Sequence, residues 1–168
     1  MSKEILIVGA GDHGRVVAET AKACGYEKID FIDDNDPTAL GKTEDLERLK
    51  REYSDGFVAI GNPQIREKMQ QKLLEYGYEI PVLVHPSAYV SPSAGIGIGT
   101  VVEPMAVINT NATIEDGCII SIGSRIDHEA HIGKFSHVNT GAIVMAYGMV
   151  PEYTKVDAGQ VVKDSRSI

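Results

Sequence analysis

The sequence predicts a small α/β unit with a parallel, Rossmann-like sheet, followed by a left-handed parallel β-helix of hexapeptide repeats. Two patterns lead to this fold class. From residue 84 to residue 162, a valine or an isoleucine recurs at every sixth position. Before that region, short apolar runs alternate with helical stretches, which is typical of a parallel sheet with right-handed crossovers. We expect the two domains to span residues 1–85 and 86–168.

The six-residue period has two registers. The first contains only valine and isoleucine: Val84, Val90, Ile96, Val102, Ile108, Ile114, Ile120, Ile126, Ile132, Val138, Val144, Val150, Val156 and Val162. The second lies two residues before the aliphatic and contains only small residues: Ala88, Ala94, Thr100, Ala106, Ala112, Cys118, Ser124, Ala130, Ser136, Ala142, Gly148 and Thr154. A period of six matches neither a helix nor a simply alternating strand.

A prism with three hexapeptides in each coil explains this period, because every hexapeptide then supplies one short strand and one corner. The β-branched aliphatics suit a strand position that points into a narrow interior, and the small residues fit the inner corner. We expect glycine and asparagine to accommodate the turns, at Gly97, Asn109, Asn111, Gly117, Gly123, Gly133 and Gly141. The flat faces of such a prism favour association into a closed homotrimer.

The pattern of apolar and helical stretches in residues 1–85 predicts alternating strands and helices. The expected strands cover residues 5–8, 29–32, 57–60 and 80–84, and the expected helices cover residues 15–24, 44–52 and 63–76. The residues between the first strand and the first helix form the sequence GxGxxG, with Gly9, Gly11 and Gly14 as its glycines. Asp33 follows Gly14 by nineteen positions, at the end of the second strand.

This glycine motif is the fingerprint of a nucleotide-binding βα turn, in which phosphates lie at the helix N-terminus. A complete dinucleotide fold has two such halves, and residues 1–85 have room for only one. The motif therefore favours a nucleotide or a nucleotide-sugar over a nicotinamide cofactor. A tight turn without any ligand is the alternative.

Composition and charge exclude several classes of protein. The net charge of -8 argues against nucleic acid or an anionic membrane surface as the main partner. Cys24 and Cys118 lie far apart and form no CxxC motif, so we expect reduced thiols. No apolar stretch approaches the ~20 residues of a membrane span. The apolar run at residues 5–8 is too short for a signal peptide, which predicts a cytoplasmic protein.

Three of the five histidines, His128, His131 and His137, fall within ten residues of the predicted β-helix. None occupies an inward position, so we expect them on the outer surface or at a subunit interface. His128 is flanked by Asp127 and Glu129. A carboxylate beside an imidazole fixes the tautomer and increases the basicity, which suits a general base. His128 has a different hexad phase from the other two, so we expect no metal site.

Five segments together resemble one family: residues 9–14, 33–34, 60–62, 84–88 and 127–139. They are similar to the bacterial sugar acetyltransferases of the sialic-acid O-acetyltransferase and bacillosamine-pathway type. The bacillosamine-pathway members N-acetylate UDP-4-amino-sugars. The similarity extends from the first strand to about Ala142 and returns at residues 150–164.

The resemblance implies a trimer that binds acetyl-CoA between neighbouring β-helices and a UDP-sugar on the N-terminal unit. It implies that His128 is the general base and that Glu129 raises its basicity. It also implies that His137 and the position of Ala146 contact acetyl-CoA. The residues implied to bind the nucleotide-sugar are Gly11, Asp12, His13, Asp33, Asp34, Gly61 and Asn62.

The chain departs from the family pattern at two residues and in the length of its β-helix. Ser121 stands where the family usually has asparagine, and Ala146 stands where it usually has glycine. After Ala142 roughly eighteen residues are missing, which is three hexads and leaves the phase intact. The groove for CoA would then be shorter. Two classes of function therefore stay open: a working acetyltransferase, acting on an amine or a hydroxyl of the sugar, and a nucleotide-sugar-binding or scaffold protein that has lost acyl transfer.

Overall fold

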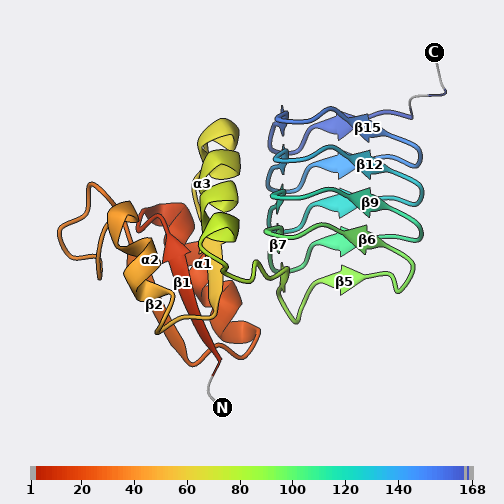
Figure 1. Cartoon of the computed structure of the whole chain (residues 1–168). Helices are drawn as coiled ribbons and strands as arrows, with labels where there is room; N and C mark the ends of the chain where they lie inside the picture. Colours follow the sequence, from red (N-terminus) through yellow and green to blue (C-terminus); the bar gives the residue numbers. More distant parts are fainter. Residues whose placement is uncertain (1–2, 165, 167–168) are drawn as a thin grey trace. The chain divides into compact units, whose positions relative to one another are not determined.

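The computed structural model describes residues 3–164 and residue 166 (Figure 1). The chain divides into two compact units, one up to Pro81 and one from Val82 onward. The predicted fold class is confirmed, because a small parallel sheet with helices precedes a parallel β-helix. In the described part of the chain, no helix is long and apolar enough to cross a membrane.

The N-terminal unit is built on a parallel sheet with the strand order β2-β1-β3. The central strand is buried on both faces, which explains its continuous apolar run Ile5, Leu6, Ile7 and Val8. The elements of this unit are β1 (Glu4–Val8), α1 (Asp12–Ala23), β2 (Lys28–Ile32), a 3₁₀ turn η1 (Thr43–Asp45), α2 (Leu46–Leu49), β3 (Asp55–Val58) and α3 (Pro63–Glu75).

Local capping sets where the two long helices begin. Gly11 is the N-cap of α1, so this helix starts three residues earlier than predicted. Before α3, the Asn62 side chain accepts a hydrogen bond from the backbone N–H of Ile65 at 3.0 Å. Pro63 at the first helical position costs no hydrogen bond there. The helix predicted at 44–52 is shorter than expected, because η1 occupies its start and α2 ends at Leu49.

The second unit is a parallel β-helix whose two-residue strands stack in three sheets (Figure 1). The first sheet has the order β16-β13-β10-β7-β4, the second β17-β14-β11-β8-β5 and the third β15-β12-β9-β6. The strands are β4 (Leu83–Val84), β5 (Tyr89–Val90), β6 (Gly95–Ile96), β7 (Val101–Val102), β8 (Val107–Ile108), β9 (Thr113–Ile114), β10 (Ile119–Ile120), β11 (Arg125–Ile126), β12 (His131–Ile132), β13 (His137–Val138), β14 (Ile143–Val144), β15 (Met149–Val150), β16 (Lys155–Val156) and β17 (Val161–Val162).

The two registers of the sequence form the interior of the β-helix. The aliphatic residue is the second residue of every strand, and the row from Val102 to Val156 is buried. The small residues from Thr100 to Ala142 are likewise buried beside it. Paired strands lie eighteen residues apart, as in Ile120 opposite Val138, so one coil contains three hexads.

One expected strand is wrong. Only Leu83 and Val84 of the predicted strand 80–84 lie in a strand, and they pair with β7. This strand therefore belongs to the β-helix and not to the α/β sheet. The prediction was too long because Ile80 is apolar and buried like Leu83, which made the whole run look like one strand, although only Leu83 of the two lies in a strand.

The turns need special residues for two different reasons: a positive φ at some positions and a lack of space for a side chain at others. The predicted turn residues include positions of both kinds. Every sixth residue from 99 to 159 has a positive φ, whether or not it is glycine: Gly99, Met105, Asn111, Gly117, Gly123, Glu129, Phe135, Gly141, Tyr147, Tyr153 and Gly159. Asn109, Gly97 and Gly133 do not belong to this set. Gly97 and Gly133 are needed for space, because a Cβ would lie 2.5 Å from the backbone nitrogen of Asp116 or Glu152 in the next coil.

The inward row gives a direct test of the fold. Replacing Ile114, which is 2% exposed, by Asp should place a carboxylate among the buried apolar side chains of the β-helix interior. We expect a cost on the order of 5 kcal/mol, comparable with the ~5–15 kcal/mol that stabilises a typical domain. The protein should be insoluble or melt far below the wild type. Thr113→Asp is the matched control, because Thr113 precedes Ile114 on the same strand and its own side chain is exposed. Equal melting of the two variants would contradict the assigned phase.

Candidate active site

The candidate catalytic histidine lies at a corner of the β-helix, in the turn between β11 and β12. Asp127 fixes the backbone of this turn. Its Oδ1 accepts hydrogen bonds from the backbone N–H of His128 at 2.7 Å and from Asn109 Nδ2 at 3.0 Å. The N–H of His128, and then the amide of Asn109, hold the pKa of the Asp127 carboxyl below its ordinary value. Asp127 is therefore an anion that orders the turn.

The imidazole of His128 is exposed and is held from one side by an aromatic ring. The ring of Tyr147, one coil further along, meets it edge to face at a centroid distance of 5.5 Å and an angle of 85°. The backbone N–H of Tyr147 donates to the carbonyl of His128 at 3.2 Å. The guanidinium of Arg166 lies 3.2 Å from the centroid of the Tyr147 ring and pairs with Asp164 at 2.9 Å. This stack holds the candidate base at the surface, where its imidazole is accessible.

Glu129 takes the left-handed corner position, with a φ of 57°. Its Oε1 accepts a hydrogen bond at 2.8 Å from Nδ2 of Asn111, one coil earlier. Among the described residues, its hydrogen-bond partner is this amide and not the neighbouring imidazole. Any effect of Glu129 on His128 in this state therefore acts through space.

The other two histidines of the cluster lie on different faces. His137 is on β13, and its Nε2 lies 2.9 Å from Oγ of Ser121. His131 is on β12, and its Nε2 lies 3.1 Å from Oε1 of Glu115. Within residues 3–164 and 166, no three His, Cys, Asp or Glu side chains are arranged to hold a metal. His128 lies at the corner between the sheets of β11 and β12, whereas His137 lies on the sheet of β13, so the two side chains start from different sides of the prism.

A cleft of about 340 Å³ opens in the N-terminal unit, at the carboxyl ends of the parallel strands. This edge of a parallel sheet is the usual place for a ligand. The residues that line it are Val8, Gly9, Ile32, Asp33, Asp34, Asn35, Thr43, Ile60, Ile65 and Met69. Asp33 accepts from the backbone N–H of Ala10 and of Asn35, both at 2.9 Å. Asp33 and Asp34 are thus two predicted substrate residues that the structure brings into one cleft.

The three glycines of the GxGxxG motif have different reasons to be glycine. Gly9 has a φ of 109°, and a Cβ there would lie 2.8 Å from the carbonyl oxygen of Ala59. A Cβ on Gly14 would collide with the carbonyl oxygen of Gly9. Gly11 has an extended backbone, and a Cβ there would meet nothing within 4 Å. The packing of this unit therefore explains Gly9 and Gly14 but leaves Gly11 free for a ligand.

The remaining predicted substrate residues lie around the starts of α1 and α3. Asp12 is exposed and pairs with Arg15 at 2.7 Å. Burial, and then the charge of Arg66, lower the pKa of His13 to about 4, so its imidazole is neutral. Its buried Nε2 has no hydrogen-bond partner among the described residues. The buried Arg66 donates to the carbonyls of Ile60 and Gly61 at 2.8 and 2.9 Å, which orders the turn before α3.

Comparison with known proteins gives the context for these two sites. Residues 4–73 match the family model described as the PglD N-terminal domain. The acetyltransferase domain of PglB from Neisseria gonorrhoeae superposes with a TM-score of 0.86 at 33% identity, over 97% of this chain and 92% of that domain. The chain belongs to this family of bacterial sugar acetyltransferases.

Two further members are similar. UDP-N-acetylbacillosamine N-acetyltransferase of Bacillus subtilis is 34% identical over 110 residues, which are 60% of this chain and 51% of that enzyme. The chain thus matches about half the length of this curated relative. PerB from Caulobacter crescentus, solved with CoA and GDP-perosamine, has a TM-score of 0.85 at 30% identity, over 96% of this chain and 89% of that one.

The sequence missed several residues that surround the candidate base. Tyr147 and Asn111 both contact the turn, and each is eighteen residues from Glu129. The coil length of three hexads was the signal that could have identified them. Ala146, which the resemblance had already placed at the acetyl-CoA site, lies one coil after His128, and its backbone N–H contributes to the low pKa of Asp127. Ser121, noted only as a departure from the family, holds His137.

Proposed function

We propose that the protein transfers the acetyl group of acetyl-CoA to the amine of a nucleotide-linked amino sugar. The single observation that carries this proposal is the exposed imidazole of His128, fixed by Tyr147 at a corner of the β-helix. The family relatives give the reaction class. Their names and ligands include a UDP-sugar, GDP-perosamine, CoA and, for the PglB domain, acetyl coenzyme A.

The chemistry needs a base but no nucleophile from the protein. The sugar amine attacks the thioester carbonyl, so a C–N bond forms while His128 takes the proton from nitrogen. The tetrahedral intermediate then collapses, the C–S bond breaks, and the CoA thiolate leaves and receives the proton from the imidazolium. Backbone N–H groups near the corner would stabilise the oxyanion. The acceptor could also be a sugar hydroxyl, and the amine is favoured because the relatives are named as N-acetyltransferases.

The proposed working unit is a homotrimer. His128 lies at the corner between the sheets of β11 and β12, whereas His137 lies on the sheet of β13. Because these positions face different sides of one prism, a site that uses both needs His137 from a neighbouring copy. The second sheet also exposes apolar side chains outward, which a neighbour would cover: Tyr89, Val107 and Val161.

Light scattering on the purified protein tests this assembly. We expect a mass three times the 18.1 kDa of the chain. A monomer mass at micromolar concentration would contradict a site shared between copies. It would leave the nucleotide cleft unaffected, since that cleft lies within one unit.

In this proposal, Asp33, Asp34 and Gly11 hold the nucleotide, and Asp12, His13, Gly61 and Asn62 lie at the two helix starts beside it. His137 and Ala146 contact acetyl-CoA. Because acetyl-CoA and nucleotide-sugars are cytoplasmic metabolites, a cytoplasmic location is part of the proposal.

An acetyl-transfer assay tests the reaction itself. Purified protein should release CoA thiol from acetyl-CoA only when a UDP-4-amino-sugar or GDP-perosamine is added. Nucleotide binding without turnover on either sugar would favour a binding protein that has lost acyl transfer.

A further inference from the structure

Thr43 links a carboxylate that lines the nucleotide cleft to an ammonium that lines a second groove beside it. Asp34 accepts hydrogen bonds from Thr43, at 2.8 Å from its backbone N–H and at 2.9 and 3.0 Å from its hydroxyl. The carbonyl of the same Thr43 accepts from Nζ of Lys72 at 3.4 Å. Asp34 and Thr43 line the cleft, and Lys72 reaches it through its hydrogen bond to Thr43.

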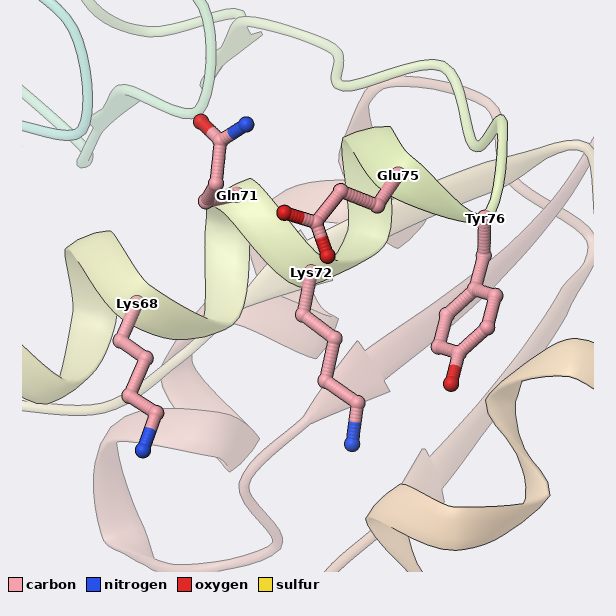
Figure 2. A pocket seen from close by; sticks show the side chains of 5 residues that line it. All are labelled: Lys68, Gln71, Lys72, Glu75 and Tyr76. Carbon is pink, nitrogen blue, oxygen red and sulfur yellow. The ribbon is translucent and has the colours of Figure 1, made fainter.

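Helix α3 contributes to both the cleft and the groove. Ile65 and Met69 line the cleft with apolar side chains. An adjacent groove of about 370 Å³ is lined by Lys68, Gln71, Lys72 and Glu75 of α3 and by Tyr76 at its C-cap. Figure 2 shows the side chains of Lys68 and Lys72 extending from the same side of α3, and that of Tyr76 extending the same way just after the helix ends. Spacings of three and four residues place Ile65, Lys68, Met69, Lys72 and Tyr76 on one helix face, and the ammonium of Lys72 lies 6.0 Å from the centroid of the Tyr76 ring.

The two charged groups have fixed hydrogen-bonding roles. The backbone N–H of Thr43 is the main cause that lowers the pKa of Asp34, and the charge of Lys72 adds to it. At neutral pH the carboxylate is therefore only an acceptor, and the ammonium is only a donor. Both keep capacity for a ligand, because a carboxylate offers about four lone-pair sites and an ammonium three protons.

A donor next to an acceptor, beside apolar walls, fits the edge of one class of flat ring. Uracil and guanine present a carbonyl oxygen next to a ring N–H, which matches an ammonium next to a carboxylate. Cytosine and adenine present the reverse, an amino group next to a bare ring nitrogen. In that reversed order, the ammonium would face an amino group and the carboxylate would face a lone pair.

We propose that Lys72 and Asp34 select nucleotides whose base carries a carbonyl beside a ring N–H. This inference rests on the proposed function, since it assumes that the nucleotide of the sugar substrate occupies this cleft. The phosphates would lie toward Gly11, and the base would lie between Ile65, Met69 and the Thr43 loop. Lys72 is then a specificity-determining residue of the substrate site.

Calorimetric titration with two matched pairs of diphosphates tests the selection. UDP and CDP differ only at the proposed edge of the base, and so do IDP and ADP. We expect UDP to bind roughly 10- to 100-fold more tightly than CDP, and IDP more tightly than ADP by a similar factor, as for one specific two-bond contact to a base. Equal affinities within both pairs, or a preference for CDP or ADP, would overturn the inference.

Two lysine variants then assign the contact. Lys72→Met should weaken UDP binding about tenfold, for the loss of one charge-assisted hydrogen bond, and leave CDP binding nearly unchanged. Lys68→Met is the matched control, because it removes an ammonium from the same groove without a bond to Thr43. Its ratio of UDP to CDP affinity should equal that of the wild type. If Lys72→Met and Lys68→Met lost UDP affinity equally, the lysines would act by general attraction of the phosphates, and the proposed contact with the base would be refuted.

The binding measurements and the acetyl-transfer assay together distinguish a failure of this inference from a failure of the proposed function. If UDP and CDP bind equally well and acetyl transfer to a nucleotide-sugar proceeds, the function stands and the base selection fails. If none of the four diphosphates binds, both the base selection and the nucleotide cleft are refuted.

Discussion

His128→Ala should lower kcat for acetyl transfer by about 10²–10⁴, the usual contribution of a positioned general base. The imidazole is exposed at the corner of the β-helix and contacts Tyr147 through its ring edge, so its removal leaves the buried interior untouched. Melting temperature should therefore stay close to that of the wild type. The KM for the nucleotide-sugar should also change little, because the cleft that binds it lies in the N-terminal unit.

His131→Ala is the matched control for this prediction. It removes a second partly exposed histidine three residues away, but one that pairs with Glu115 on a different face. Turnover by this variant should be close to that of the wild type. Undiminished turnover by His128→Ala would refute the assignment of the base, whereas a large and equal loss in both variants would point to damage of the fold.

The period of six made the β-helix predictable in detail. Position within the hexad determines whether a side chain points inward or outward, and a hexad needs only local sequence to be recognised. The same arithmetic extends to contacts between coils, since Asn111, Glu129 and Tyr147 are stacked by their spacing of eighteen residues. The spacing of residues does not show which neighbour an outward side chain contacts. The resemblance implies that Glu129 raises the basicity of His128, and the structure adds that the Glu129 carboxylate accepts a hydrogen bond from Asn111.

The N-terminal unit was less predictable, because its contacts join residues without a repeat. The glycine motif and Asp33 indicated the cleft, and both lie at the carboxyl end of the sheet as expected. No pattern linked Lys72 to Thr43, which is 29 residues away, or showed that Nε2 of His13 is buried without a partner. Nor did the motif show which of its glycines are needed for packing. That distinction appears only when the space around each Cα is known.

Gly11→Val should reduce affinity for the nucleotide-sugar at least 100-fold while the protein remains folded. A branched side chain at this N-cap would occupy the space in which phosphates approach the first N–H groups of α1. Its cost to stability should stay near 1 kcal/mol, since the backbone there is extended and a Cβ meets nothing within 4 Å. Calorimetry with the nucleotide-sugar measures the first effect, and thermal melting measures the second.

Gly95→Val is the appropriate control, because Gly95 also has open space around its Cα but lies on β6 of the β-helix. It should bind the nucleotide-sugar as the wild type does. Gly14→Val should instead unfold the N-terminal unit, because its Cβ would collide with the carbonyl of Gly9. If Gly11→Val binds the nucleotide-sugar with unchanged affinity, the loop between β1 and α1 is a structural turn only. The nucleotide would then have to be held without the N-terminus of α1.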